Sequence, residues 1–167
     1  MSTNKKLIIM CGPAGSGKTT WVQDHASAGV SAHISRDRIR FDMLQPGEHY
    51  FAREDEVYAE FVKEIAHALT CSWVNEVYAD ATHLTEQARM KLVHCVDRHL
   101  PQEFTYDLNA VVINPPLEVA LQRNAQRTGR ACVPETVIRN MYNSFEDPWD
   151  DEHLYYNNVF YEEEGGN

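Results

Sequence analysis

The sequence predicts an α/β fold, a three-layer αβα sandwich in which about five mostly parallel strands carry helices on both faces. Short apolar runs alternate with longer segments whose apolar residues recur every three to four positions, the pattern of alternating strands and helices. A glycine-rich loop follows the first apolar run. The chain has 167 residues, of which 43 % are apolar. That is enough for one core, so we expect a single domain over residues 1–167.

The first expected strand covers residues 7–10 and leads into a glycine-rich loop from Gly12 to Thr19. The loop fits the phosphate-loop pattern G-x-x-x-x-G-K-[ST] at every fixed position. The stretch that follows has no glycine or proline as far as residue 28 and predicts a helix that ends near Gly29. A plain glycine turn before a helix is the alternative, but it does not require the lysine and threonine.

Each position of this loop has a chemical reason. Glycines let the backbone turn tightly and approach a polyphosphate, and the loop N–H groups then point at its negative charge. Lys18 reaches the β- and γ-phosphates, and the hydroxyl of Thr19 faces Mg²⁺. The predicted cofactors are therefore ATP and Mg²⁺, with the nucleotide held by Gly12, Ala14, Gly15, Ser16, Gly17, Lys18, Thr19 and Thr20.

A second strand is expected over residues 30–34, followed by the segment Ser35–Arg40. The carboxyl ends of parallel strands share one edge of the sheet, so this segment should lie on the same rim as the phosphate loop. There Asp37 fits a general base for an acceptor hydroxyl, and Arg40 fits a clamp on a phosphate of the acceptor. The alternative is that Ser35 or Asp37 caps a helix to about residue 44, a role that can coexist with catalysis.

A third strand is expected over residues 76–79, after a helix whose apolar stripe runs from about residue 53 to 69. Asp80 ends this strand beside the phosphate loop, where an acidic residue can hold Mg²⁺ directly or through water. An aspartate that caps a turn is the competing interpretation. His83 is expected to be a surface or turn residue.

Three further helices and two strands complete the chain. A helix over residues 85–99 leaves Arg89 off its apolar side, where it could be solvated, strands follow over residues 106–113 and 159–161, and the last helix opens at Val133-Pro134. The helix after Asn114 carries Arg123 and Arg127 on one face and ends at an arginine- and glycine-containing turn. We expect a lid over about residues 123–133 that closes these arginines over the phosphates. Solvated arginines near a helix end are the ordinary alternative.

The composition narrows the classes of partner and location. A net charge of −10 argues against wrapping a long duplex, although a few arginines suffice to hold one strand end. The acidic C-terminal part, including Asp150, Asp151 and a tail over about residues 162–167, is expected to be solvated. No apolar run approaches the ~20 residues that span a membrane. The four scattered cysteines predict reduced thiols in a cytoplasmic protein and no zinc site.

Four blocks of this chain resemble the kinase domain of phage-type 5′-hydroxyl polynucleotide kinases, within the P-loop kinases grouped with zeta-toxin-like and AAA-33 proteins. They are residues 12–21, residues 35–40, residues 80–84, and residues 123–127 followed by Val133-Pro134 and Met141-Tyr142. The resemblance implies that Lys18 and Thr19 bind ATP phosphates and Mg²⁺. It makes Asp37 the base toward the 5′-hydroxyl and Arg40 the ligand of the phosphate on its 3′ side. Arg127 becomes the lid arginine, Arg123 lies near the nucleotide, and Asp80 supports the metal or acceptor site.

The sequence also departs from that family. The third block reads Asp80-Ala81-Thr82-His83 where the family has Asp-Thr-Asn, and the segment between Arg127 and Val133 carries an extra residue. We expect an ATP-dependent kinase of a hydroxyl, with the 5′-hydroxyl of a DNA or RNA end as the favoured acceptor. The alternatives are a small-molecule kinase (nucleoside, nucleotide-sugar or antibiotic hydroxyl) and an ATP-binding switch module without an acceptor.

Overall fold

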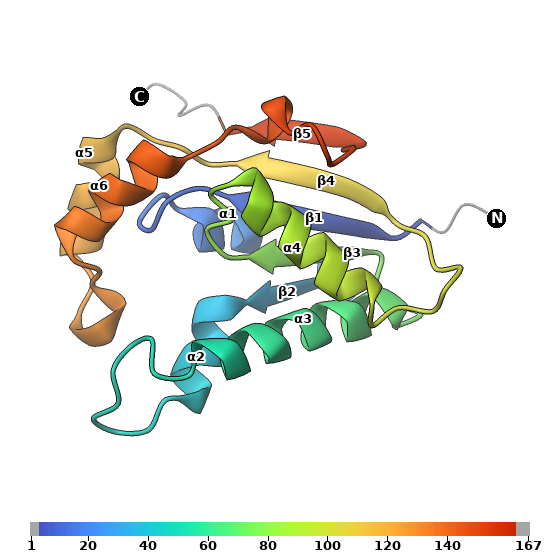
Figure 1. Ribbon diagram of the computed structural model, residues 1–167, viewed down its shortest axis with the longest axis horizontal. Helices are drawn as coiled ribbons and strands as arrows, with labels where there is room; N and C mark the ends of the chain where they lie inside the picture. The colour runs from blue at the N-terminus through green and yellow to red at the C-terminus, as the bar shows by residue number, and fades with distance from the viewer. Residues whose placement is uncertain (1–3, 163–167) are drawn as a thin grey trace.

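The computed structural model describes residues 4–162 and is built on one five-stranded sheet (Figure 1). The strands lie in the order β2-β3-β1-β4-β5, and each neighbouring pair is parallel. This confirms the predicted fold class. The strands are β1 Lys6–Cys11, β2 Ser31–Ser35, β3 Glu76–Asp80, β4 Asp107–Val112 and β5 Asn158–Tyr161.

Helices cover both faces of this sheet, as predicted (Figure 1). Along β1, Leu7 and Ile9 point into one apolar cluster that includes side chains of α3 and α4, whereas Ile8 and Met10 point into a second that includes Val22 of α1. The side chains therefore alternate between two buried layers, as expected for a central parallel strand. The helices are α1 Lys18–His25, α2 Arg36–Met43, α3 Glu54–Thr70, α4 Glu86–Asp97, α5 Leu117–Ala125 and α6 Glu135–Ser144, with short 3₁₀ turns η1 Gly129–Ala131 and η2 Pro148–Asp150.

The first helix is shorter than the sequence predicts. It ends at His25, and Ala26 leaves the helical conformation with a ψ of 132° while its N–H still bonds to the carbonyl of Val22. The next N–H, of Ser27, donates to the hydroxyl of Ser31 at 3.0 Å. This local bond offers the backbone an alternative to another helical turn, so Gly29 lies in the loop and does not cap the helix.

Arg89 is fully buried, and the prediction that it is solvated is wrong. Its Nε and Nη2 donate to the two carboxylate oxygens of Asp151 at 2.8 and 2.6 Å, and its Nη1 donates to the carbonyl of His83 at 2.8 Å. Tyr156 donates its hydroxyl to the same carboxylate. Asp151 was expected in a solvated acidic run, but its carboxylate is almost fully buried too, because the segment after η2 carries it onto Arg89.

His83 is a turn residue, as expected, but it is buried and not at the surface. It has a φ of 42°, and its Nδ1–H donates to the carbonyl of Met10 at 2.8 Å. Burial lowers its pKa to about 4, so the ring is neutral near pH 7. The turn after β3 is thereby fixed to β1, the strand that enters the phosphate loop.

All four cysteines are free, as predicted, and burial raises the pKa of the Cys11 thiol to about 12. Among residues 4–162, no helix is both long enough and apolar enough to cross a bilayer. Of the acidic tail, Glu162 is described and accepts a hydrogen bond from Trp21, whereas residues 163–167 lie outside the described residues.

Candidate functional site

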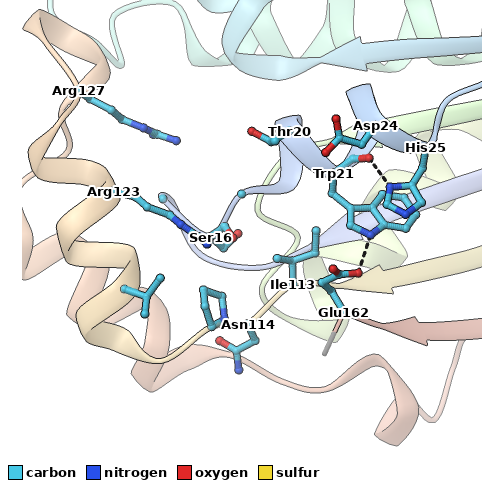
Figure 2. Close-up of a pocket in the computed structure, with 14 residues that line it drawn as sticks. Ser16, Thr20, Trp21, Asp24, His25, Ile113, Asn114, Arg123, Arg127 and Glu162 are labelled. Carbon is cyan, nitrogen blue, oxygen red and sulfur yellow. Dashed lines mark hydrogen bonds between the residues drawn. The ribbon is translucent and has the colours of Figure 1, made fainter. Parts of the chain in front are cut away.

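The glycine-rich loop lies between β1 and α1 at the carboxyl edge of the sheet (Figure 2). Gly15 has a φ of 78°, and a Cβ there would stand 2.6 Å from the carbonyl oxygen of Ala120 in α5. A Cβ on Gly12 would stand 2.1 Å from the carbonyl oxygen of Ile113. The chain therefore needs glycine at positions 12 and 15 because the segment after β4 and helix α5 pack closely against the loop. This requirement exists whether or not a ligand is bound.

Lys18 is buried inside this loop. Its ammonium donates to the carbonyl of Pro13 at 2.8 Å and to the hydroxyl of Ser16 at 3.4 Å. Burial lowers its pKa to about 8, against the opposing effect of the carboxylates of Asp80 and Asp37. The Lys18 ammonium therefore lies at the centre of the loop, and among residues 4–162 its hydrogen-bond partners are a carbonyl oxygen and a hydroxyl oxygen.

Thr19 and Asp80 meet at the end of β3. The Thr19 hydroxyl donates to Oδ2 of Asp80 at 2.8 Å, and Nε2 of His33 lies 2.8 Å from the same oxygen. Burial acts to raise the pKa of Asp80, but the bonds from His33 and Thr19 hold it below its usual value, so it is a carboxylate.

His33 did not emerge from the sequence. It lies on β2, and the register pairs it with Tyr78, two residues before Asp80 on β3. Pairing the two strands in parallel would have found it, because residues two apart point to the same side.

A hydroxyl and a carboxylate are ligands that Mg²⁺ accepts, and the pair fits that ion. Within residues 4–162 there is no cluster of three or more His, Cys, Asp or Glu side chains able to hold a metal. Mg²⁺ in kinases is commonly held by one or two protein oxygens together with substrate phosphates and water. Thr19 and Asp80 are therefore compatible with such a site and not with a metal cage made only of protein.

Asp37 lies in the first turn of α2. The Ser35 hydroxyl caps this helix by accepting the N–H of Arg38 at 3.3 Å. Because Ser35 supplies the cap, the Asp37 carboxylate remains 58 % exposed. Ser35 is therefore the capping residue, and the Asp37 carboxylate is left available for another role.

Arg40 is almost fully buried and donates hydrogen bonds to three side chains, those of Glu54, Asp37 and Tyr50. Its Nε and Nη2 donate to the carboxylate of Glu54 at 2.6 and 3.0 Å. Its Nη1 donates to Asp37 and to the hydroxyl of Tyr50, the latter at 2.7 Å, while Tyr50 donates to Asp37 at 2.7 Å. Burial opposes the charge of Arg40, but its bonds to the Glu54 carboxylate and the nearby anions raise its pKa. Sequence reasoning found Asp37 and Arg40 but missed Tyr50 and Glu54, which come from a loop and a helix further along the chain.

A cavity of about 780 Å³ opens on the other side of the phosphate loop (Figure 2). Arg123 and Arg127 of the expected lid project into it, and Arg123 donates from Nη1 to the carbonyl of Ser16 at 2.7 Å. Thr20, at the opening of α1, also lines it. The two lid arginines are therefore placed at the phosphate loop, on the side where α1 and α5 face each other.

The far wall of this cavity was not predicted. Trp21 stacks on His25 with ring centroids 3.9 Å apart, and its indole N–H donates to Glu162 at 2.9 Å. Trp21, His25 and Glu162 all line the cavity, together with Asp24 and Asn114. Trp21 lies next to the loop in sequence, but its ring contact appears only when α1 is built as a helix, since residues four apart share a face.

Comparison with known proteins places this geometry in a family. The family described as an AAA domain (AAA_33) matches residues 7–148. The chain belongs to the AAA_33 family. The matched range includes the phosphate loop, Asp37, Asp80 and both lid arginines, whereas Asp151, β5 and Glu162 lie outside it. No protein of curated function matches the sequence.

Solved structures share the fold of this AAA_33 chain at low identity. The fungal RNA kinase structure aligns with a TM-score of 0.67 at 15 % identity over 98 % of this chain and 76 % of that one. A chain of the Pnkp1/Rnl/Hen1 RNA repair complex gives 0.66 at 20 % identity over 84 % of this chain, which spans only 43 % of the other. A gluconokinase from Sinorhizobium meliloti 1021 gives 0.55 at 18 % identity, over 96 % and 83 % of the two chains. These likenesses identify the fold as that of P-loop kinases.

Proposed function

We propose that this protein transfers the γ-phosphoryl group of ATP, with Mg²⁺, to the 5′-hydroxyl of a DNA or RNA end. The observation that carries the proposal is the exposed carboxylate of Asp37, held against Arg40 on the rim that also bears the phosphate loop and Asp80. An ATP switch has no use for such a base. The likeness to a fungal RNA kinase and to an RNA repair complex supports a nucleic-acid acceptor.

The chemistry assigned to the chain is mainly positioning and charge neutralisation. The loop N–H groups and Lys18 hold the phosphates, and Arg123 of α5 and Arg127, just after that helix, approach them. Mg²⁺ at Thr19 and Asp80 would neutralise charge that develops on the phosphate oxygens. Asp37 takes the proton of the 5′-hydroxyl as the hydroxyl oxygen bonds to the γ-phosphorus of ATP. The bond between the γ-phosphorus and the bridging oxygen breaks, and ADP leaves.

Arg40 links acceptor binding to this proton transfer. In the structure its Nη1 donates to Asp37 and Tyr50, while Glu54 holds its other two donors. A phosphate on the 3′ side of the acceptor nucleoside would take over Nη1 and leave the Glu54 contacts in place. Asp37 would then lose the bond from Arg40, which frees a carboxylate oxygen to accept the proton of the 5′-hydroxyl.

A small-molecule hydroxyl is the second candidate acceptor. The structural likeness to a gluconokinase and to a sugar kinase from Janibacter sp. HTCC2649, and the net charge of −10, favour it. For either acceptor we propose a cytoplasmic protein, since ATP is its donor and its four cysteines are free.

Transfer of labelled γ-phosphate to short 5′-hydroxyl DNA and RNA oligonucleotides tests the proposal. The wild type should label them, and Lys18→Ala should abolish labelling. Asp37→Asn should lower kcat by about 10²–10⁴-fold, the range for loss of a general base, while calorimetry shows nearly wild-type affinity for ATP. A wild-type preparation that binds ATP and labels neither oligonucleotide would contradict the nucleic-acid acceptor. Full turnover in Asp37→Asn would contradict the base.

A further inference from the structure

The loop between α2 and α3, together with Phe41 of α2, presents a cluster of aromatic rings beside the candidate base. Tyr50 lies with its ring centroid 4.7 Å from that of Phe51 at an interplanar angle of 88°, and 5.9 Å from that of Phe41. Phe51 is 54 % exposed and Phe41 is 37 % exposed. Exposed aromatic rings scattered singly need no explanation, but rings gathered at a reactive carboxylate do.

Tyr50 connects this cluster to Asp37 and Arg40. Its hydroxyl donates to Asp37, and its ring lies under the Arg40 guanidinium at 4.4 Å from ring centroid to Cζ. The Phe51 ring is 5.9 Å from the same guanidinium carbon. Phe51 is therefore one side chain away from the base and adjacent to the arginine proposed to hold the acceptor's phosphate.

The loop is fixed in place from both sides. Arg53, at the start of α3, holds the Glu48 carboxylate through Nε and Nη2 at 2.9 Å each. Arg130 of η1 donates to the backbone carbonyl of Glu48 at 3.2 Å, so the connection between α5 and α6 meets this loop (Figure 1). A fixed loop can offer an exposed ring as a preorganised surface, which lowers the entropic cost of binding a flat ligand.

We propose that Phe51, supported by Tyr50 and Phe41, is a stacking surface for a nucleobase at the 5′ end of the acceptor strand. This inference rests on the proposed function and deepens it, because it makes the acceptor one that carries a base. Aromatic side chains bind single-stranded nucleic acid by stacking and do so with little sequence preference. The choice of a base over a sugar follows from the surface: an open aromatic ring beside an arginine suits a flat ring next to a phosphate.

The test pairs a residue deletion with a base deletion. The KM for 5′-hydroxyl oligonucleotides is measured with an intact strand and with strands lacking the base at position 1 or position 2. In the wild type, removal of the stacked base should raise KM about tenfold. Phe51→Ala should raise the KM for the intact strand by a similar factor. In this variant, removal of the base should change KM by less than about twofold, because the ring on which the base stacks is already absent.

Two variants show whether stacking is responsible. Phe51→Trp should retain the low KM, because it keeps an aromatic face. Phe160→Ala removes a phenylalanine of similar exposure, 51 %, from β5 and should behave as the wild type with all three strands. Affinity for ATP should be the same in every variant.

Three results would overturn the inference. If the wild type labels oligonucleotides but base removal costs Phe51→Ala as much as the wild type, the stacking surface is wrong and the proposed function stands. If Phe51→Ala labels all strands with wild-type KM, Phe51 has no part in acceptor binding. If the wild type binds ATP but labels no oligonucleotide, the proposed function and the stacking surface fail together.

Discussion

The region of the sheet edge proposed to bind the nucleotide, here called the nucleotide side, is held together largely by bonds to backbone groups. The region proposed to bind the acceptor, here called the acceptor side, is held together by side chains. On the nucleotide side, Gly12 donates its N–H to Thr82, and Lys18 and Arg123 both donate to loop carbonyls. On the acceptor side, Asp37, Arg40, Tyr50 and Glu54 bond to one another through their side chains. The first region is therefore organised around one short motif, to which Thr82 and Arg123 are bonded, while the second depends on residues from α2, the following loop and α3.

One way to test this comparison is to remove a buried contact that belongs to neither region, because its loss should lower stability and leave the two regions alike. The Arg89–Asp151 pair is such a contact, and Arg89 also donates to the carbonyl of His83 in the turn that follows Asp80. Asp151→Ala leaves the Arg89 cation buried without its partner and should cost about 3–5 kcal/mol of unfolding free energy. Urea unfolding monitored by circular dichroism measures this loss.

The neighbouring Asp150 provides a matched control. It is exposed, so Asp150→Ala should change the unfolding free energy by less than about 0.5 kcal/mol. The Asp151→Ala protein that remains folded should keep the wild-type ratio between its KM for ATP and its KM for the acceptor. Equal stability of the two variants would show that the buried pair supports nothing.

A second prediction concerns pH and affects only the nucleotide side. Burial lowers the pKa of Lys18 to about 8, so the free protein loses this charge as the pH rises through 8. ATP requires the charged form, and its affinity should therefore fall by about tenfold for each pH unit above 8. Calorimetric titration at pH 7, 8, 9 and 10 measures it, with proton uptake on binding above pH 8. A flat affinity over this range would contradict the assignment of Lys18 to the phosphates.

A smaller loss of ATP affinity should follow from a substitution in the proposed lid. Arg123→Gln removes the charged bond to the Ser16 carbonyl and a cation from the cavity. Affinity for ATP should fall about tenfold, as for loss of one hydrogen bond from a charged group, while the KM for the acceptor stays within twofold. Arg139→Gln removes an exposed arginine that is paired with Glu135 on α6 and should leave both constants as they are. A selective rise in the acceptor KM of Arg123→Gln would place this arginine on the wrong side of the loop.

The sequence predicts the sheet and the nucleotide side well, for physical reasons. A parallel strand buried on both faces reads as an apolar run, and a phosphate loop must carry glycine, lysine and threonine at fixed spacing. Each such signal is local. The parallel direction and the two covered faces of the sheet follow from the alternation of strands and helices, and Asp37 and Asp80 follow from their places at strand ends. The strand order β2-β3-β1-β4-β5 was not predicted.

The rest depends on contacts between distant segments. Arg89 was expected in solvent because no signal in α4 shows that Asp151, 62 residues later, will neutralise it. Tyr50 and Glu54 reach Arg40 across a loop that contains Pro46 and Gly47, and the path of such a loop is not encoded by periodicity. His33 reaches Asp80 only through the pairing of β2 with β3.

One competition assay tests the central claim most directly. A 5′-hydroxyl oligonucleotide, a mixture of free nucleosides, and gluconate with common monosaccharides are presented together with labelled ATP and Mg²⁺, and the label is followed to its product. We predict that the oligonucleotide takes the label and that Asp37→Asn prevents this. Label on a nucleoside or on a sugar in preference to the strand would contradict a nucleic-acid end as the acceptor and assign the aromatic cluster at Asp37 to a small molecule.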